Sequence, residues 1–264
     1  MARLTLFTTG NPKTEKGAEY GYATAILHLA PASLSGRNVC PSASQGCIAS
    51  CLNTAGRGGL MDGMARLSHA DVARGTVNTI QAARIRRTQW LFADRSGFLA
   101  AMVRDMERHA AWCKREGWIP AFRFNGTSDL DWQGMAGNAG LDLDSLVRRL
   151  GARAYDYTKV ASRAKRESDA YSLTFSLSES NDSAASDWLA NGGNVAVVFR
   201  VRPSIGGRDA AALPASAMIG GIVAPVVDGD KHDLRFLDAR GSIIGLRAKG
   251  NAWRDASGFV REVA

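Results

Sequence analysis

Residues 119–129 read Ile119-Pro-Ala-Phe-Arg-Phe-Asn-Gly-Thr-Ser-Asp129, a short apolar run that ends in polar side chains. The apolar part predicts a buried strand over Ile119–Phe124, and the residues after it predict a turn. In a parallel sheet, the residues that follow a strand lie at the carboxyl-end rim, where active sites form. The stretch therefore indicates an α/β fold and gives the first candidate catalytic residues, Asn125 and Asp129. A turn that only caps the next helix is the alternative.

The same pattern recurs twice further along the chain. A strand predicted over Ala152–Tyr157 is followed by Lys159. A second strand, predicted over Tyr171–Leu177, is followed by Glu179. Lys159 and Glu179 are candidates for proton transfer or for binding the ends of a substrate, whereas solvated rim charges are the alternative. Polar groups thus follow three predicted strands, and they can lie together at the carboxyl-end rim of the sheet.

Other segments continue the alternation of strands and helices. The remaining predicted strands are Tyr22–Ala30, Val195–Val201, Ile219–Val227, Asp233–Leu237 and Ile243–Leu246, and the predicted helices in this part are Leu143–Leu150 and Asp182–Ala190. Apolar residues at near-helical spacing predict a helical region before residue 117, with a break around Ser96-Gly97.

We therefore expect one α/β domain over residues 1–264, built as a partial or complete parallel β/α barrel. Its parts are an early strand with a cysteine-rich loop in residues 1–60, a helical insertion in 61–117, and alternating strands and helices in 118–264.

Three of the four cysteines fall in Cys40-Pro-Ser-Ala-Ser-Gln-Gly-Cys-Ile-Ala-Ser-Cys51. Clustered cysteines in a cytoplasmic chain bind metal or do redox work more often than they form disulfides. Six residues separate Cys40 from Cys47 and three separate Cys47 from Cys51, whereas structural zinc usually takes closely spaced pairs. The uneven spacing favours a [4Fe–4S] cluster held by Cys40, Cys47 and Cys51.

Two alternatives to the cluster stay open. Zinc is the first, with His28 as the nearest candidate for a fourth ligand. Three small buried thiols without any metal are the second, because free cysteine is among the most buried residues. Cys113, far from the other three, is expected to pack in a helix.

The chain has 264 residues, of which 45% are hydrophobic and 22% charged, and these are the proportions of an ordinary soluble globular protein. It has no apolar run long enough for a transmembrane helix and no recognisable signal peptide, so we expect no membrane partner and a cytoplasmic location.

The net charge of +8 favours polyanions as partners, nucleic acid first among them. One stretch concentrates this charge, and its basic residues are Arg148, Arg149, Arg153, Lys159, Arg163, Lys165 and Arg166.

Several longer motifs together resemble the bacteriophage family known as gene product 88. They are Asn11-Pro-Lys13, Thr24-Ala-Ile-Leu-His-Leu-Ala-Pro31, the block from Asn38 to Gly58 with its three cysteines, Arg87-Thr88, Asn125-Gly-Thr-Ser-Asp129, Tyr155-Asp-Tyr-Thr-Lys159, Leu173-Thr-Phe-Ser-Leu-Ser-Glu179, Asn194-Val-Ala-Val-Val-Phe199, Asp228-Gly-Asp230, Asp233-Leu-Arg-Phe236 and Gly245-Leu-Arg-Ala-Lys-Gly250. The resemblance runs nearly end to end. It implies a phage or prophage origin and the cytoplasm of an infected cell, and it implies no mechanism.

The cysteines also resemble those of radical S-adenosylmethionine barrels, in which a triad follows an early strand. That superfamily usually has the order Cys-x3-Cys-x2-Cys, and this chain departs from it with six and three intervening residues. The resemblance implies an open iron that binds the methionine end of the cofactor, which makes S-adenosylmethionine a candidate cofactor.

Three functions are consistent with these observations. The favoured one is a phage-encoded iron–sulfur protein, of redox or radical type if it is an enzyme, with a polar pocket for a small-molecule substrate facing the cluster. The second is a zinc-containing protein that acts on nucleic acid, for instance by modifying DNA bases. The third is a host-interaction protein without catalysis, in which a metal only stabilises the cysteine loop.

Overall fold

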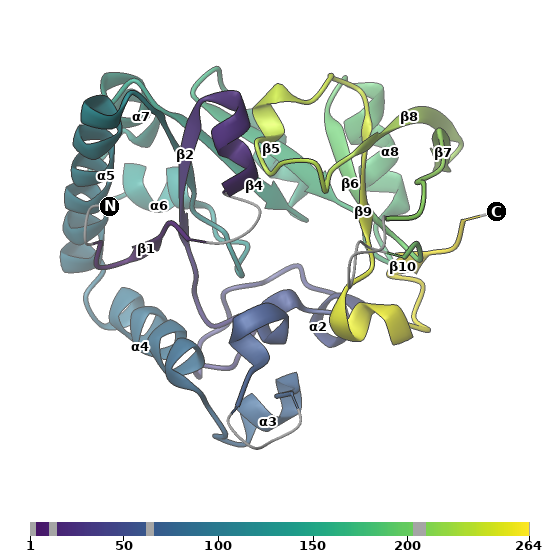
Figure 1. The fold of residues 1–264 in the computed structure, drawn as a ribbon, viewed down its shortest axis with the longest axis horizontal. Coiled ribbons are helices and arrows are strands. Elements are labelled where there is room, and N and C mark those ends of the chain that lie inside the picture. Colours follow the sequence, from purple (N-terminus) through teal and green to yellow (C-terminus); the bar gives the residue numbers. More distant parts are fainter. Residues whose placement is uncertain (1–3, 11–14, 62–65, 203–209, 264) are drawn as a thin grey trace.

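The structure is a computed structural model that describes residues 4–10, 15–61, 66–202 and 210–263 (Figure 1). Asn11-Pro-Lys13, which carry part of the resemblance noted above, lie outside the described residues. The described chain is a mixed α/β domain around one ten-stranded sheet.

The strands pair in the order β1-β2-β3-β4-β5-β6-β9-β8-β7, and β10 also pairs with β6. Their bounds are β1 Phe7–Thr8, β2 Tyr22–Leu27, β3 Ile119–Arg123, β4 Arg153–Thr158, β5 Tyr171–Ser176, β6 Asn194–Phe199, β7 Ser216–Ile219, β8 Ile222–Asp228, β9 Ile243–Arg247 and β10 Val260–Arg261.

The helices lie mostly between the strands. The α-helices are α2 Gln45–Ala49, α3 His69–Ala73, α4 Thr79–Ala93, α5 Arg95–Glu116, α6 Trp132–Gly137, α7 Leu143–Arg149 and α8 Asp182–Ala190. The 3-10 helices are η1 Lys16–Tyr20, η2 Leu52–Thr54, η3 Gly56–Gly59, η4 Ala161–Arg166, η5 Arg235–Leu237 and η6 Gly250–Arg254.

The sheet is mostly parallel, as the alternation of elements predicts, but it does not close into a barrel. From β2 to β6 each strand pairs in parallel with the next strand along the chain. The path ends in antiparallel strands on both sides, with β1 on β2 and β7 on β8. Because β9 takes the place beside β6 and β8 lies outside it, the chain adds strands outward and leaves two open edges.

One face of the sheet is covered by helices. In this face α5 packs on β3, α7 on β4, and α8 on β5 and β6. The rings of His109 on α5 and Phe122 on β3 lie 5.5 Å apart, edge to face. Met102 and Met106 of α5 are fully buried in the same core. The apolar spacing that predicts this helix is therefore the spacing of its buried face.

The opposite face is covered by η5 rather than by a strand, which corrects the prediction of a strand over Asp233–Leu237. Leu234 is buried against Tyr155, and the Tyr155 hydroxyl donates to Asp233 Oδ2 at 3.1 Å. Arg123 Nη1 donates to the same oxygen at 2.8 Å. The segment crosses the sheet face and buries both polar and apolar side chains there, so its alternating pattern needs no strand partner.

Two other predicted boundaries change in the structure. The strand predicted over Ile219–Val227 is a hairpin, because Gly220 and Gly221 have φ of 54° and 87° and reverse the chain between β7 and β8. Positive φ at both central residues is what a two-residue hairpin turn requires. The predicted helix break lies at Asp94, whose Oδ1 accepts from Gly97 N at 2.9 Å and begins α5.

No helix within the described ranges is long and apolar enough to cross a membrane.

Candidate functional site

The three clustered cysteines lie beyond the carboxyl ends of the parallel strands, in residues 38–60, which we call the cysteine segment. Figure 1 shows α2, α3 and α4 gathered on that side of the molecule, beyond the end of β2. The segment is not simply a loop: Cys47 lies in α2, and Cys51 directly precedes η2. Each of the three cysteines is partly exposed as a residue, although the Cys51 thiol itself is buried.

Cys40 is held by a strained turn that follows β2. Ala32 has φ of 48°, and among the described residues it alone has a positive φ without being glycine. This conformation aims the Ala32 N–H at Cys40 Sγ, 3.3 Å away, while the Ala32 carbonyl accepts from Val39 N at 3.1 Å. The Cys40 thiol also faces Thr127 O at 3.8 Å. Strained backbone persists where the surrounding structure enforces it, and it often marks functional sites.

Charges around Cys40 include two of the predicted site residues. The pKa of the Cys40 thiol is raised to about 11, chiefly by burial and to a smaller extent by Cys47 and Asp129, against the lowering effects of the Ala32 N–H and of Lys159. Asp129 and Lys159 thus influence the pKa of Cys40, and their catalytic roles stay predictions.

Glu179 holds the helix that carries Cys47. Its Oε1 accepts from Gly46 N at 2.7 Å and its Oε2 accepts from Ser44 Oγ at 2.6 Å. Ser44 Oγ in turn accepts from Cys47 N at 3.2 Å and caps α2. Glu179 is therefore a positioning residue for Cys47 in this geometry.

Gly46 lets α2 approach the end of the chain closely. A Cβ at this position would lie 2.1 Å from Ser257 Oγ and 2.8 Å from Phe259 Cβ, so only glycine fits. Cys47 packs beside Phe259 and Val260, together with residues of η6.

Cys51 is fixed through the residue that lies two positions after it. Asn53 is fully buried and exchanges hydrogen bonds with Gln81 of α4: Asn53 Nδ2 donates to Gln81 Oε1 at 2.8 Å, and Gln81 Nε2 donates to Asn53 O at 2.9 Å. Arg84 Nη1 donates to Asn53 Oδ1 at 2.6 Å. The pKa of Cys51 is raised to about 12, chiefly by burial and to a smaller extent by Cys47 and Cys40, against the lowering effects of the Asn53 backbone and of Arg84.

Lys159 and Asp129 are tied to different partners from Glu179. Asp129 Oδ2 accepts from Lys159 N at 2.7 Å. Lys159 Nζ donates to Ser176 Oγ at 2.7 Å and lies 5.5 Å from the centre of the Phe259 ring. Neither a hydrogen bond nor an ion pair links Lys159 to Glu179 in the described part of the chain.

Asn125 belongs to a buried network that sequence reasoning did not anticipate. Its Nδ2 donates to Asp156 Oδ2 at 2.9 Å, and its backbone N donates to Asp156 Oδ1 at 2.7 Å. Its Oδ1 accepts from Leu130 N at 3.0 Å and from Trp132 Nε1 at 3.1 Å. The amide therefore fixes the turn after β3, and its predicted catalytic role stays a prediction.

Asp156 is the residue that the sequence analysis passed over. It is fully buried, and it also accepts from the Tyr171 hydroxyl. Burial raises the pKa of its carboxyl to about 6, against the opposing effect of Arg163. The signal in the sequence was a carboxylate in the middle of a buried strand, between Tyr155 and Tyr157.

The arrangement of the His, Cys, Asp and Glu side chains bears on whether a metal ion could bind. Among the residues that the structure describes, no group of three or more His, Cys, Asp or Glu side chains is arranged to hold a metal ion. One zinc ion would bring its sulfur ligands to about 2.3 Å from itself, and therefore close together. A cluster binds each thiolate at a different iron, so its ligands are spread more widely. His28, the nearest candidate for a fourth zinc ligand, has Nδ1 3.2 Å from Thr8 Oγ1.

Most of the basic stretch around residue 160 is already neutralised. Four of its arginines form ion pairs, which are Arg148–Asp169, Arg149–Glu107, Arg163–Asp129 and Arg166–Asp131. The stretch is therefore less suited to polyanions than its sequence indicates.

Comparison with known proteins gave one match. The family model described as Gene product 88 matches residues 5–263. Neither the curated proteins nor the solved structures contained a significant match.

Proposed function

Given that the chain belongs to the gene product 88 family, we propose that it is an iron–sulfur protein whose Cys40, Cys47 and Cys51 hold a [4Fe–4S] cluster. One observation carries the proposal: three cysteines fall within twelve residues of one segment, which follows β2 at the carboxyl end of the parallel strands. Thiolates are the ligands that iron–sulfur clusters use.

The spacing of the cysteines favours a cluster over a single zinc ion. Six and three residues separate them, whereas structural zinc usually takes closely spaced pairs. The Ala32 N–H is aimed at Cys40 Sγ, and hydrogen bonds to sulfur tune the potential of such clusters.

The chain's own residues would position the cluster and its substrate. Glu179 orients α2 and with it Cys47, while Asn53 and Arg84 fix the backbone beside Cys51. Lys159 supplies a cation near Cys40, as its effect on the Cys40 pKa indicates. When bound, the cluster would supply one-electron chemistry, so a redox or radical-type reaction is the proposed class.

The experiment is purification under nitrogen, followed by iron, sulfide and zinc analysis. We expect a brown protein with about four irons and four sulfides per chain. Cys47→Ala should lose the iron, whereas Cys113→Ala, a matched change in the buried face of α5, should keep it. Full iron content in Cys47→Ala would contradict the assignment. A colourless protein with one zinc would favour the zinc alternative.

A nucleic-acid-binding function is the second candidate, and one observation favours it. The exposed faces of α4 and α5 present arginines that form no ion pair with described residues, namely Arg86, Arg95, Arg104 and Arg108. This candidate predicts DNA binding that weakens steeply with added salt. A flat salt response would count against it.

A further inference from the structure

A pocket of about 490 Å³ lies beside the cysteine segment. Its walls are the turn after β3, from Asp129 to Asp131, and the η4 region after β4. Pro41, the neighbour of Cys40, forms part of its rim. The volume suits a small molecule, and the carboxyl ends of parallel strands are where such ligands bind.

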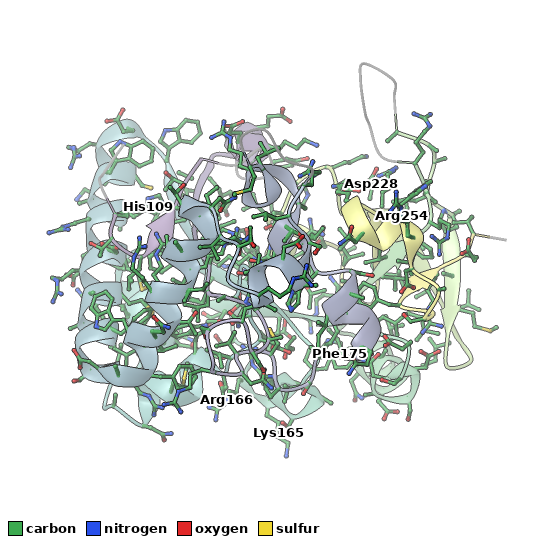
Figure 2. All side chains as sticks on the ribbon, turned by 90° about the horizontal axis from the view of Figure 1, so that it is seen from below. His109, Lys165, Arg166, Phe175, Asp228 and Arg254 are labelled. Atoms are coloured by element: carbon green, nitrogen blue, oxygen red, sulfur yellow. The ribbon has the colours of Figure 1, made fainter. Side chains whose placement is uncertain are left out.

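The charged side chains of this pocket leave an excess of positive charge. Arg163, Lys165 and Arg166 line it together with Asp129 and Asp131. Both carboxylates are already paired, because Arg163 Nη1 lies 3.1 Å from Asp129 Oδ1 and Arg166 Nε lies 2.9 Å from Asp131 Oδ2. Lys165 forms no ion pair with any described residue, and Figure 2 shows it pointing outward beside Arg166.

Arg163 forms the inner wall and still has hydrogen-bond donors to spare. The residue is 2% exposed. Its Nε and Nη2 make no hydrogen bond of normal geometry within the described residues, although the Tyr171 hydroxyl lies near the side chain. Buried donors without an acceptor are rare in folded proteins and call for an explanation. An anion in the pocket would be attracted by the positive charge of this side chain, which lines the wall.

We infer that this pocket binds the substrate of the proposed iron–sulfur protein through a carboxylate or phosphate group held by Arg163 and Lys165. That the ligand is a substrate rests on the proposed function. That an anion binds rests on the pocket residues alone. With its anionic group at Arg163 and Lys165, a ligand places its other end toward Pro41 and Cys40. Arginine is well suited to the inner position, because its planar donors match carboxylate and phosphate oxygens.

The test is calorimetric titration of the whole chain with inorganic phosphate and, separately, with succinate, at constant ionic strength. We expect one of the two to bind more tightly than chloride, and the tighter one identifies the group. Lys165→Glu should weaken that binding tenfold or more, since it reverses a charge at the pocket. Lys165→Arg should largely keep it. Lys231→Glu, the same charge change at an exposed residue outside the pocket, should bind as the wild type does.

The same experiments distinguish failure of the pocket inference from failure of the iron–sulfur proposal. Equal binding by the wild type and Lys165→Glu, or no binding of either anion beyond chloride, would overturn the pocket inference even if the chain holds iron. Binding that depends on Lys165 in a chain without iron would support the pocket and overturn the iron–sulfur proposal.

Discussion

Two polar clusters lie near the carboxyl ends of the same strands, and they differ in how completely their hydrogen bonds are satisfied. In the Asp156 cluster, made of Asn125, Asp156 and Tyr171, each carboxylate oxygen accepts at least one hydrogen bond. In the cysteine segment, the three residues are partly exposed, and Cys40 Sγ has two polar contacts, with Ala32 N at 3.3 Å and Thr127 O at 3.8 Å. A cluster whose donors and acceptors are all used supports the fold, whereas one with bonding capacity left can bind something else.

The largest expected effect comes from removing the Asp156 carboxylate, the acceptor of the Asp156 cluster. Asp156→Ala removes the acceptor of the buried Asn125 backbone N–H and of the buried Tyr171 hydroxyl, whereas the Asn125 side-chain amide keeps its bond to Leu130 O. Each such group costs about 1–3 kcal/mol, so the free energy of unfolding should fall by about 3 kcal/mol or more. Urea denaturation measures this change. Asp187→Ala, on the exposed side of α8, is the control and should change little.

A loss of stability in Asp156→Ala no larger than in Asp187→Ala would remove the contrast between the two clusters.

The pH dependence of stability gives a second test of the Asp156 cluster. The pKa of Asp156 is raised to about 6, so the folded state holds this proton more tightly than the unfolded state does. The stabilisation is complete below the unfolded pKa and is lost as the pH rises to about 6. At about 1.4 kcal/mol per pKa unit, this group should account for a decrease of about 3 kcal/mol.

Other carboxyl groups act in the opposite direction. The pKa values of Asp228 and Asp255 are lowered, so their stabilisation is lost as the pH falls. Comparing urea denaturation of the wild type and Asp156→Asn between about pH 4 and pH 7 isolates the Asp156 contribution. Parallel curves for the two proteins would show that Asp156 keeps an ordinary pKa in the folded state.

The smallest effect is expected in the cysteine segment. Glu179→Gln keeps one acceptor oxygen but removes the charge that holds Ser44 and Gly46, so stability should fall by about 1 kcal/mol. The sharper readout is alkylation of Cys47, which should become several-fold faster as α2 loosens. Alkylation of Cys113, buried in α5, serves as the internal control. An unchanged Cys47 rate would mean that Glu179 does not position the helix.

Local patterns predicted the central parallel strands well, because each is an apolar run bounded by turn residues. The predicted helix Asp182–Ala190 is confirmed over the same residues. Closure of the sheet could not be predicted, since it depends on which edge β8 and β9 occupy. The Gly220-Gly221 turn was hidden inside a long apolar run.

The sequence predicted where the candidate site residues lie, after the strands, but not which hydrogen bonds they make. Asn125 and Asp129 follow the same strand, yet the first is saturated inside the Asp156 cluster and the second lines the pocket. Residue type and position after a strand are the same for both. Only the side-chain contacts, which come from distant segments such as Arg163 and Trp132, separate them.

The packing of α2 against Phe259 has a consequence for the order of events on the ribosome. Cys47 is made early, but Phe259 and Val260, which pack beside it, are made last among these residues. A nascent chain therefore leaves Cys47 uncovered until residue 260 has been made, and contacts between such distant segments form slowly. Under the proposed function, iron delivery to Cys47 would have to wait for that point, and until then this thiol would be open to oxidation.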